Sequence, residues 1–178
     1  MAIPDPVPAP AGITLLFGCG RDWPPERWSA FMAYFAHRGD PCYAVPLPAA
    51  WPRDADPSLP PILLVLAAHL GASALAPHPR QPRAALALLQ PPLSLLPPLL
   101  YRAIGARGAA PPIWVALGAA RPLSVRLWQA AFPTPSSPRS PGSVHIHPFQ
   151  GLHHALPDLP GWERIAFALR RHLLWPPD

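Results

Sequence analysis

The chain has 178 residues, half of them hydrophobic and 13% charged, which suits one domain with a core and is too short for two. Its net charge is +5, but the 14 basic residues are all arginine and are spread along the chain, so the basic stripe of a nucleic-acid-binding protein is missing. The longest apolar run, 62–70, falls far short of the roughly 20 residues that a membrane span needs.

The first part of the chain predicts a β-α-β unit. The proline-rich residues 1–11 have neither the basic nor the apolar segment of a secretory leader, and we expect a flexible lead. An apolar run ending at glycine predicts a buried strand over 12–20. A Pro-Pro-Glu start, apolar positions at helical spacing and a final glycine predict a helix over 24–39, and 41–48 predicts a second strand.

The middle of the chain is interrupted by many of its 32 prolines. Residues 49–61 have no periodicity and predict a loop, whereas 62–70 predicts a third strand and 71–76 a short helix. The alanine and leucine residues of 83–92 fit a strand or a helix equally well, and 93–108 favours a short helix.

The last part continues the alternation of strands and helices. Strands are predicted over 112–120 and 143–149, and helices over 122–132 and 159–174. Such alternation is typical of α/β proteins. We therefore expect one domain over 1–178, built as a three-layer α/β/α sandwich around a mostly parallel sheet of about six strands.

The order of these elements resembles the α/β-hydrolase family over nearly the whole chain, in a shortened form. The segment LVLAAHLGASALA is similar to the strand, Gly-His-Ser-x-Gly-Gly turn and helix that carry the family's nucleophile. PPIWVALGAARPL resembles the strand and Gly-x-x-Asp-Pro turn that carry its acid, and HPFQGLHH resembles the turn that carries its histidine.

The motifs themselves depart from the family pattern. The resemblance places Ala68, Leu70 and Ala72 at the glycine, serine and glycine of the nucleophile elbow. It places Arg121 at the acid and Phe17 at the oxyanion-loop histidine. Leucine has no nucleophilic atom, and arginine cannot orient an imidazole as a carboxylate does. The catalytic histidine is still represented, by His153 or His154.

We therefore predict a non-catalytic α/β-hydrolase-like protein that acts by ligand binding or protein contact. The resemblance implies a pocket above the strand ends, with a protein or an apolar or acyl small molecule as partner. Its lining residues would be Cys19, Trp23, His69, Leu70, Arg121 and His153.

Two alternatives stay open. One is an active esterase or thioesterase with Ser73 or Cys19 as nucleophile and His153 or His154 as base. The other is a structural subunit of a larger assembly, for which the seven tryptophans would supply contacts.

We expect no metal and no cofactor. Cys19 and Cys42 form neither a zinc-ligand nor a disulfide pattern and suit the reduced cytoplasm, where we place the protein. Alternate positions on a strand would bring His145 and His147 to one face, where His153 or His154 could add a third metal ligand. Eight histidines in one chain also produce such groups by chance, and we favour that interpretation.

Overall fold

The computed structural model describes residues 13–47, 62–70, 84–97, 112–120, 122–132 and 143–173. The predicted lead, the loop over 49–61 and the short helix over 71–76 lie outside these ranges, as do Ala72, Ser73 and Arg121.

Six strands form one parallel sheet. They are β1 (Thr14–Cys19), β2 (Cys42–Pro46), β3 (Ile62–Ala67), β4 (Ala84–Leu89), β5 (Ile113–Gly118) and β6 (Val144–Phe149). Their order is β2-β1-β3-β4-β5-β6, and each neighbouring pair is parallel. The expected parallel sheet is confirmed, and the ambiguous segment 83–92 contains a strand.

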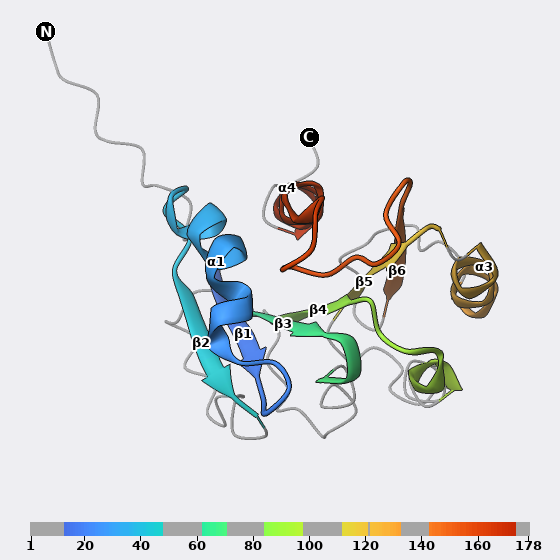
Figure 1. Ribbon diagram of the computed structural model, residues 1–178, viewed down its shortest axis with the longest axis horizontal. Coiled ribbons are helices and arrows are strands. Elements are labelled where there is room, and N and C mark those ends of the chain that lie inside the picture. Colours follow the sequence, from blue (N-terminus) through green and yellow to red (C-terminus); the bar gives the residue numbers. More distant parts are fainter. Residues whose placement is uncertain are drawn as a thin grey trace, which may run out of the picture.

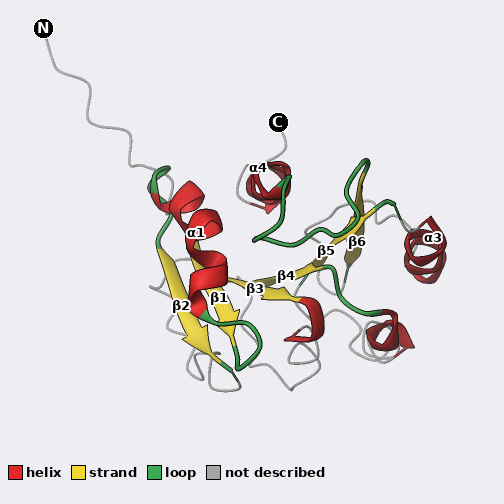
Figure 2. Cartoon of the chain, viewed as in Figure 1, coloured by secondary structure: helices red, strands yellow, loops and turns green. Residues whose placement is uncertain are grey.

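Helices cover both faces of the sheet. The helical elements are η1 (Pro25–Trp28), α1 (Ser29–Ala36), η3 (Leu93–Leu95), α3 (Pro122–Ala131) and α4 (Trp162–Leu173). Figure 1 shows α1 and α4 on one side of the sheet, and Figure 2 shows the red helices separated by the yellow strands. Together with η3 and α3 on the opposite face, they complete the predicted three-layer α/β/α arrangement.

The core has two parts because neighbouring side chains on a strand point to opposite faces. In β3, Leu63 and Val65 pack with α1 and α4, whereas Leu64 and Leu66 pack with α3 and η3. All six residues of β3 are buried, which explains its continuous apolar sequence. Trp28 and Trp128, both fully buried, are the largest side chains that the helices contribute to the two parts.

A partly buried ion pair joins α4 to the turn that follows α1. Arg170 Nε donates to Asp40 Oδ2 at 2.8 Å, and only 9% of Asp40 is exposed. A buried carboxylate is costly without a partner, so this contact stabilises the packing of α1 on α4. Among the helices that the structure describes, none is long and apolar enough to cross a membrane.

Candidate functional site

The strand order places a topological switch point between β1 and β3. The chain leaves β1 toward β2 on one side, whereas the strands after β3 follow one another on the other side. In open parallel sheets, ligands bind beyond the carboxyl ends of the strands at such a point. The turns after β1 and β3 are therefore the first place to examine for function.

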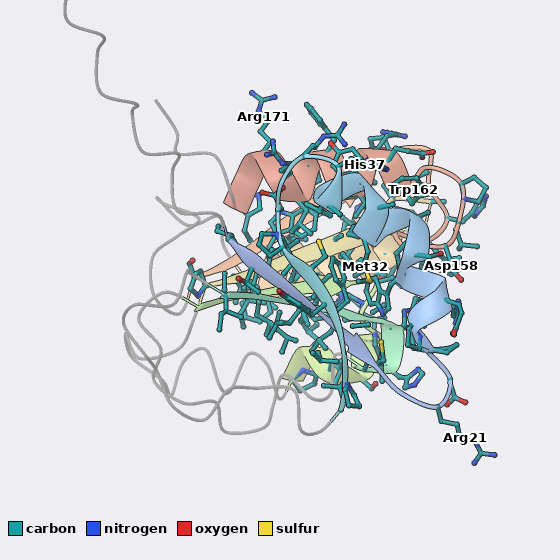
Figure 3. The ribbon with its side chains drawn as sticks, turned by 90° about the vertical axis from the view of Figure 1, so that its left-hand side faces the viewer. Arg21, Met32, His37, Asp158, Trp162 and Arg171 are labelled. Atoms are coloured by element: carbon teal, nitrogen blue, oxygen red, sulfur yellow. The ribbon has the colours of Figure 1, made fainter. Side chains whose placement is uncertain are left out.

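The turn after β1 is closed by its own backbone. Gly20 N donates to Trp23 O at 3.0 Å, and Trp23 N donates to Gly20 O at 3.1 Å. The two residues between them, Arg21 and Asp22, are exposed, and Figure 3 shows Arg21 pointing away from the protein. Because the amide of Gly20 is already used, this glycine-containing turn lacks one of the free donors that a phosphate-binding loop requires.

The turn after β3 begins with a strained residue. Ala68 has φ of 47°, in the left-handed region that alanine rarely adopts, and residues 68–70 form a single helical turn. The predicted strand over 62–70 is therefore too long by three residues. The left-handed residue lies two positions before Leu70, the position expected for the nucleophile.

Leu70 fills the space between the two turns. Its Cδ2 lies 3.0 Å from where a Cβ on Gly20 would be, and its side chain packs on the core beneath α1 and α4. A larger residue than glycine at position 20 would therefore require the end of the Leu70 side chain to shift by a few tenths of an ångström. An apolar side chain therefore lies between the turns that follow β1 and β3, next to the switch point.

Two other residues predicted for the pocket are buried. Cys19 is 7% exposed and Trp23 is 2% exposed, and both belong to the core. The Cys19 thiol donates to Phe17 O at 3.5 Å, and burial raises the pKa of this thiol. Because the thiolate is the nucleophile, a raised pKa makes Cys19 poorly suited to covalent catalysis.

The histidines near the strand ends are exposed or half-buried. His69 and His153 are exposed, and His154 is half-buried. Among the described residues, the carboxylate within ion-pair distance of a histidine is that of Asp22, whose Oδ2 lies 3.8 Å from His69 Nε2. Both groups are largely in solvent, which weakens their attraction. The sequence did not identify Asp22, and its position three residues after the end of a strand was the available signal.

Gln90 holds the loop that carries His153 and His154. Its Oε1 accepts hydrogen bonds from Gly118 N at 2.8 Å and Ala155 N at 2.9 Å. Gln90 itself has φ of 48° and follows β4 directly. The Gln90 side-chain oxygen therefore connects the ends of β4 and β5 to the loop after β6. The sequence around Gln90 gives no indication of this contact.

Gly118 allows the same loop to lie directly on the strand ends. A Cβ at Gly118 would lie 2.5 Å from the backbone carbonyl carbon of His153. The backbone cannot come this close to any other residue type. The position of the His153 loop therefore depends on Gly118 as well as on Gln90.

Arg27 connects the turn after β1 to the loop before α4. Its guanidinium lies 3.5 Å from the centre of the Trp23 ring, and its Nη1 donates to Asp22 O at 3.1 Å. The same group pairs with the carboxylate of Asp158. In Figure 3, Asp158 lies on the loop close to the start of α4, beside Trp162. The turn after β1 and the loop before α4 are thus connected by an ion pair, in addition to the hydrogen bond and the ring contact that Arg27 makes within the turn.

No family model, curated protein or solved structure matches the chain.

Proposed function

We propose that the chain is a non-catalytic α/β-hydrolase-like protein that acts by binding, with a protein partner favoured over a small molecule. The observation that carries the proposal is Leu70, which fills the space beside Gly20 at the switch point. Leucine puts a side chain without a nucleophilic atom at position 70, and its packing against Gly20 takes up space that an acyl ligand at this point would need.

The chemistry of the neighbouring residues supports the same interpretation. The left-handed residue after β3 is Ala68, which has no nucleophilic atom. Cys19 is buried with a raised pKa. His69 and His153 remain available for polar contacts in solvent, and exposed side chains at loop ends are a common basis of binding.

Ester hydrolysis tests the loss of catalysis. We expect purified protein to hydrolyse p-nitrophenyl butyrate no faster than an equal concentration of free imidazole, and to resist labelling by a fluorophosphonate probe. The matched variants are Ser73→Ala and Cys19→Ala. Hydrolysis that disappears in either variant would overturn the proposal and identify the nucleophile.

Titration with a fatty acid distinguishes binding of a small molecule from binding of a protein partner. A medium-chain fatty acid should change neither the melting temperature nor the tryptophan fluorescence of the wild type. Leu70→Ala opens space at the switch point and serves as the comparison. Saturable binding of the fatty acid to the wild type would show that a small molecule enters there despite Leu70.

A further inference from the structure

The strand β2 forms one edge of the sheet. Among the described strands it pairs with β1 alone, and Figure 1 shows it beyond β1 at one side of the molecule. Three of its residues, Tyr43, Ala44 and Pro46, are exposed. At the opposite edge, no residue of β6 is exposed. Of the two edges, β2 is therefore the one that another chain can reach.

The backbone of β2 presents free hydrogen-bonding groups on its outer side. At the two ends of the pairing, β1 bonds to Pro41 O at 2.8 Å and to Leu47 N at 2.9 Å. Because the bonds of a strand alternate between its two sides, positions 43 and 45 also face β1, and positions 42, 44 and 46 face outward. Pro46 agrees with this assignment, because proline in a sheet occupies places where its missing N–H is not needed. The N–H and C=O of Ala44 therefore point away from the sheet.

The exposed surface of α1 and β2 carries no charged side chain. The two elements pack against each other, and the exposed residues of α1 are Ser29, Ala30, Ala33 and Ala36. By contrast, the exposed face of α4 carries Glu163, Arg164 and Arg171. A two-fold interface brings the same patch of two copies together, so like charges in it would repel. In a chain of net charge +5, an uncharged surface is where two copies can meet.

The outward groups of β2 are complementary to themselves. A two-fold axis makes the same strand of two copies antiparallel. With the axis at Ala44, its N–H and C=O bond to the C=O and N–H of Ala44 in the second copy, as in any hydrogen-bonded antiparallel pair. The N–H of Cys42 then faces the C=O of Pro46 in the second copy, a bond that does not use the missing N–H of proline. Pro46 removes the return bond and ends the pairing there.

The same register covers an exposed aromatic side chain. Tyr43, which is 57% exposed, would lie opposite Val45 of the second copy at a non-hydrogen-bonded position, where side chains approach more closely. Aromatic and β-branched side chains stabilise such cross-strand pairs. Both side chains lie on the face of the sheet opposite α1, where Val45 already packs on the core. Pairing of two copies would therefore bury apolar surface as well as satisfy backbone groups.

We propose that this edge binds a second copy of the chain, with the two β2 strands antiparallel about Ala44 and the two sheets continuous. Each copy uses its β2 edge against the same edge of the other, so the assembly closes as a dimer. The proposal does not rest on the proposed binding function. Ester hydrolysis and fatty-acid binding test that function, whereas the mass of the particle tests this one.

Sedimentation equilibrium between about 1 and about 100 μM protein tests the dimer, a range suited to the modest affinity of a short interface. We expect the mass to rise from 19.2 kDa to twice that value. Ala44→Pro removes an N–H that faces away from β1, and should weaken dimerisation at least about tenfold. Ala44→Ser keeps the N–H and should dimerise within about threefold of the wild type. Circular dichroism confirms that each variant is folded.

A charged edge provides a second variant. Tyr43→Lys places a cation on β2, as natural proteins do to prevent edge pairing, and should weaken dimerisation at least about tenfold. The matched control is Leu123→Lys, which places the same charge on a 69% exposed leucine of α3 and should leave dimerisation unchanged. A chain that stays monomeric over the whole range would overturn the proposal. Dimerisation of Ala44→Pro and Tyr43→Lys with wild-type affinity would also overturn it, because the interface would lie elsewhere.

Hydrogen exchange tests the register on the unaltered protein. The Ala44 amide should exchange at least about tenfold more slowly at the highest protein concentration than at the lowest. The Leu123 amide, in the first turn of α3, should exchange equally at both concentrations. Protection of Ala44 at every concentration would show that the chain covers its own edge, and would contradict the proposal.

Discussion

The guanidinium of Arg27 and the carboxylate of Asp158, 131 residues apart in the chain, form a close ion pair in which two nitrogens, Nε at 2.7 Å and Nη2 at 2.6 Å, contact Oδ2. Arg27 also stacks on Trp23. The side chains of Arg27 and Asp158 are 34% and 25% exposed, so solvent screens part of the attraction. Contacts between residues so distant in sequence form only when the whole sheet is assembled.

Replacing Arg27 with alanine should lower the free energy of unfolding by about 1–2 kcal/mol, because it removes the ion pair and the stack on Trp23 together. Urea denaturation measures this change. The matched control is Arg21→Ala, six residues away in the exposed turn, which should stay within about 0.5 kcal/mol of the wild type. A double-mutant cycle with Asp158→Asn should show a coupling of about 0.5–1 kcal/mol, and a coupling of zero would mean that the pair itself does not stabilise the fold.

Replacing Gln90 with alanine should release the loop that carries His153. Two backbone N–H groups, those of Gly118 and Ala155, lose their acceptor, and each unsatisfied donor costs about 1–3 kcal/mol. Hydrogen exchange should therefore be at least tenfold faster at the Ala155 amide. Gln90→Glu keeps an acceptor oxygen at this place and serves as the control. Unchanged exchange in Gln90→Ala would show that the loop is held by other contacts.

Glycine should have opposite effects at two neighbouring alanines. Ala68→Gly relieves a left-handed conformation and should raise the free energy of unfolding by up to about 1 kcal/mol. Ala67→Gly removes a fully buried methyl group from β3 and should lower it by about 1 kcal/mol or more. Thermal and urea denaturation of both variants measure the difference. If both substitutions destabilise equally, Ala68 is not strained in solution.

Alkylation of Cys42 should be slow and strongly dependent on pH. Burial, assisted by the charge of Asp40, raises the pKa of its thiol to about 11. At pH 8 its thiolate fraction is then about 0.1%, compared with about a quarter for a free cysteine, and the rate should rise about tenfold per pH unit until about pH 11. Mass spectrometry after treatment with iodoacetamide follows the reaction, and protein in urea is the control. Rapid labelling of the folded protein at pH 8 would contradict the assigned environment.

The architecture was largely predictable, because the buried strands of a parallel sheet have a recognisable sequence pattern. Both faces of β3 and β5 are buried, so their residues form continuous apolar runs, and prolines and glycines separate the elements. Residues 84–89 were ambiguous because alanine and leucine suit either kind of element. These residues form a strand because they pair with β3 on one side and with β5 on the other. Residues 68–70 were expected in β3, but the left-handed conformation of Ala68 ends the strand.

The candidate site was predictable only in outline. The order of elements indicated that the ends of β1, β3, β5 and β6 would meet at one edge, and the described ends do so. Cys19 and Trp23, which the sequence predicts as pocket-lining residues, are buried members of the core, and their place in a pocket stays a prediction. The contacts that hold the turns come from Gln90 and Arg27, which no local pattern distinguishes from other polar residues.

What the sequence by itself determined is the alternation of strands and helices and the absence of a nucleophile at Leu70. Hydrophobic periodicity and residue chemistry are local properties, and both can be read from neighbouring positions. Only the tertiary structure decided that Leu70 packs against Gly20, that Gln90 joins the ends of β4 and β5 to the loop after β6 through one oxygen, and that Arg27 meets Asp158. These relations depend on the register and spacing of strands far apart in the chain, and such distances are set by packing of the whole sheet.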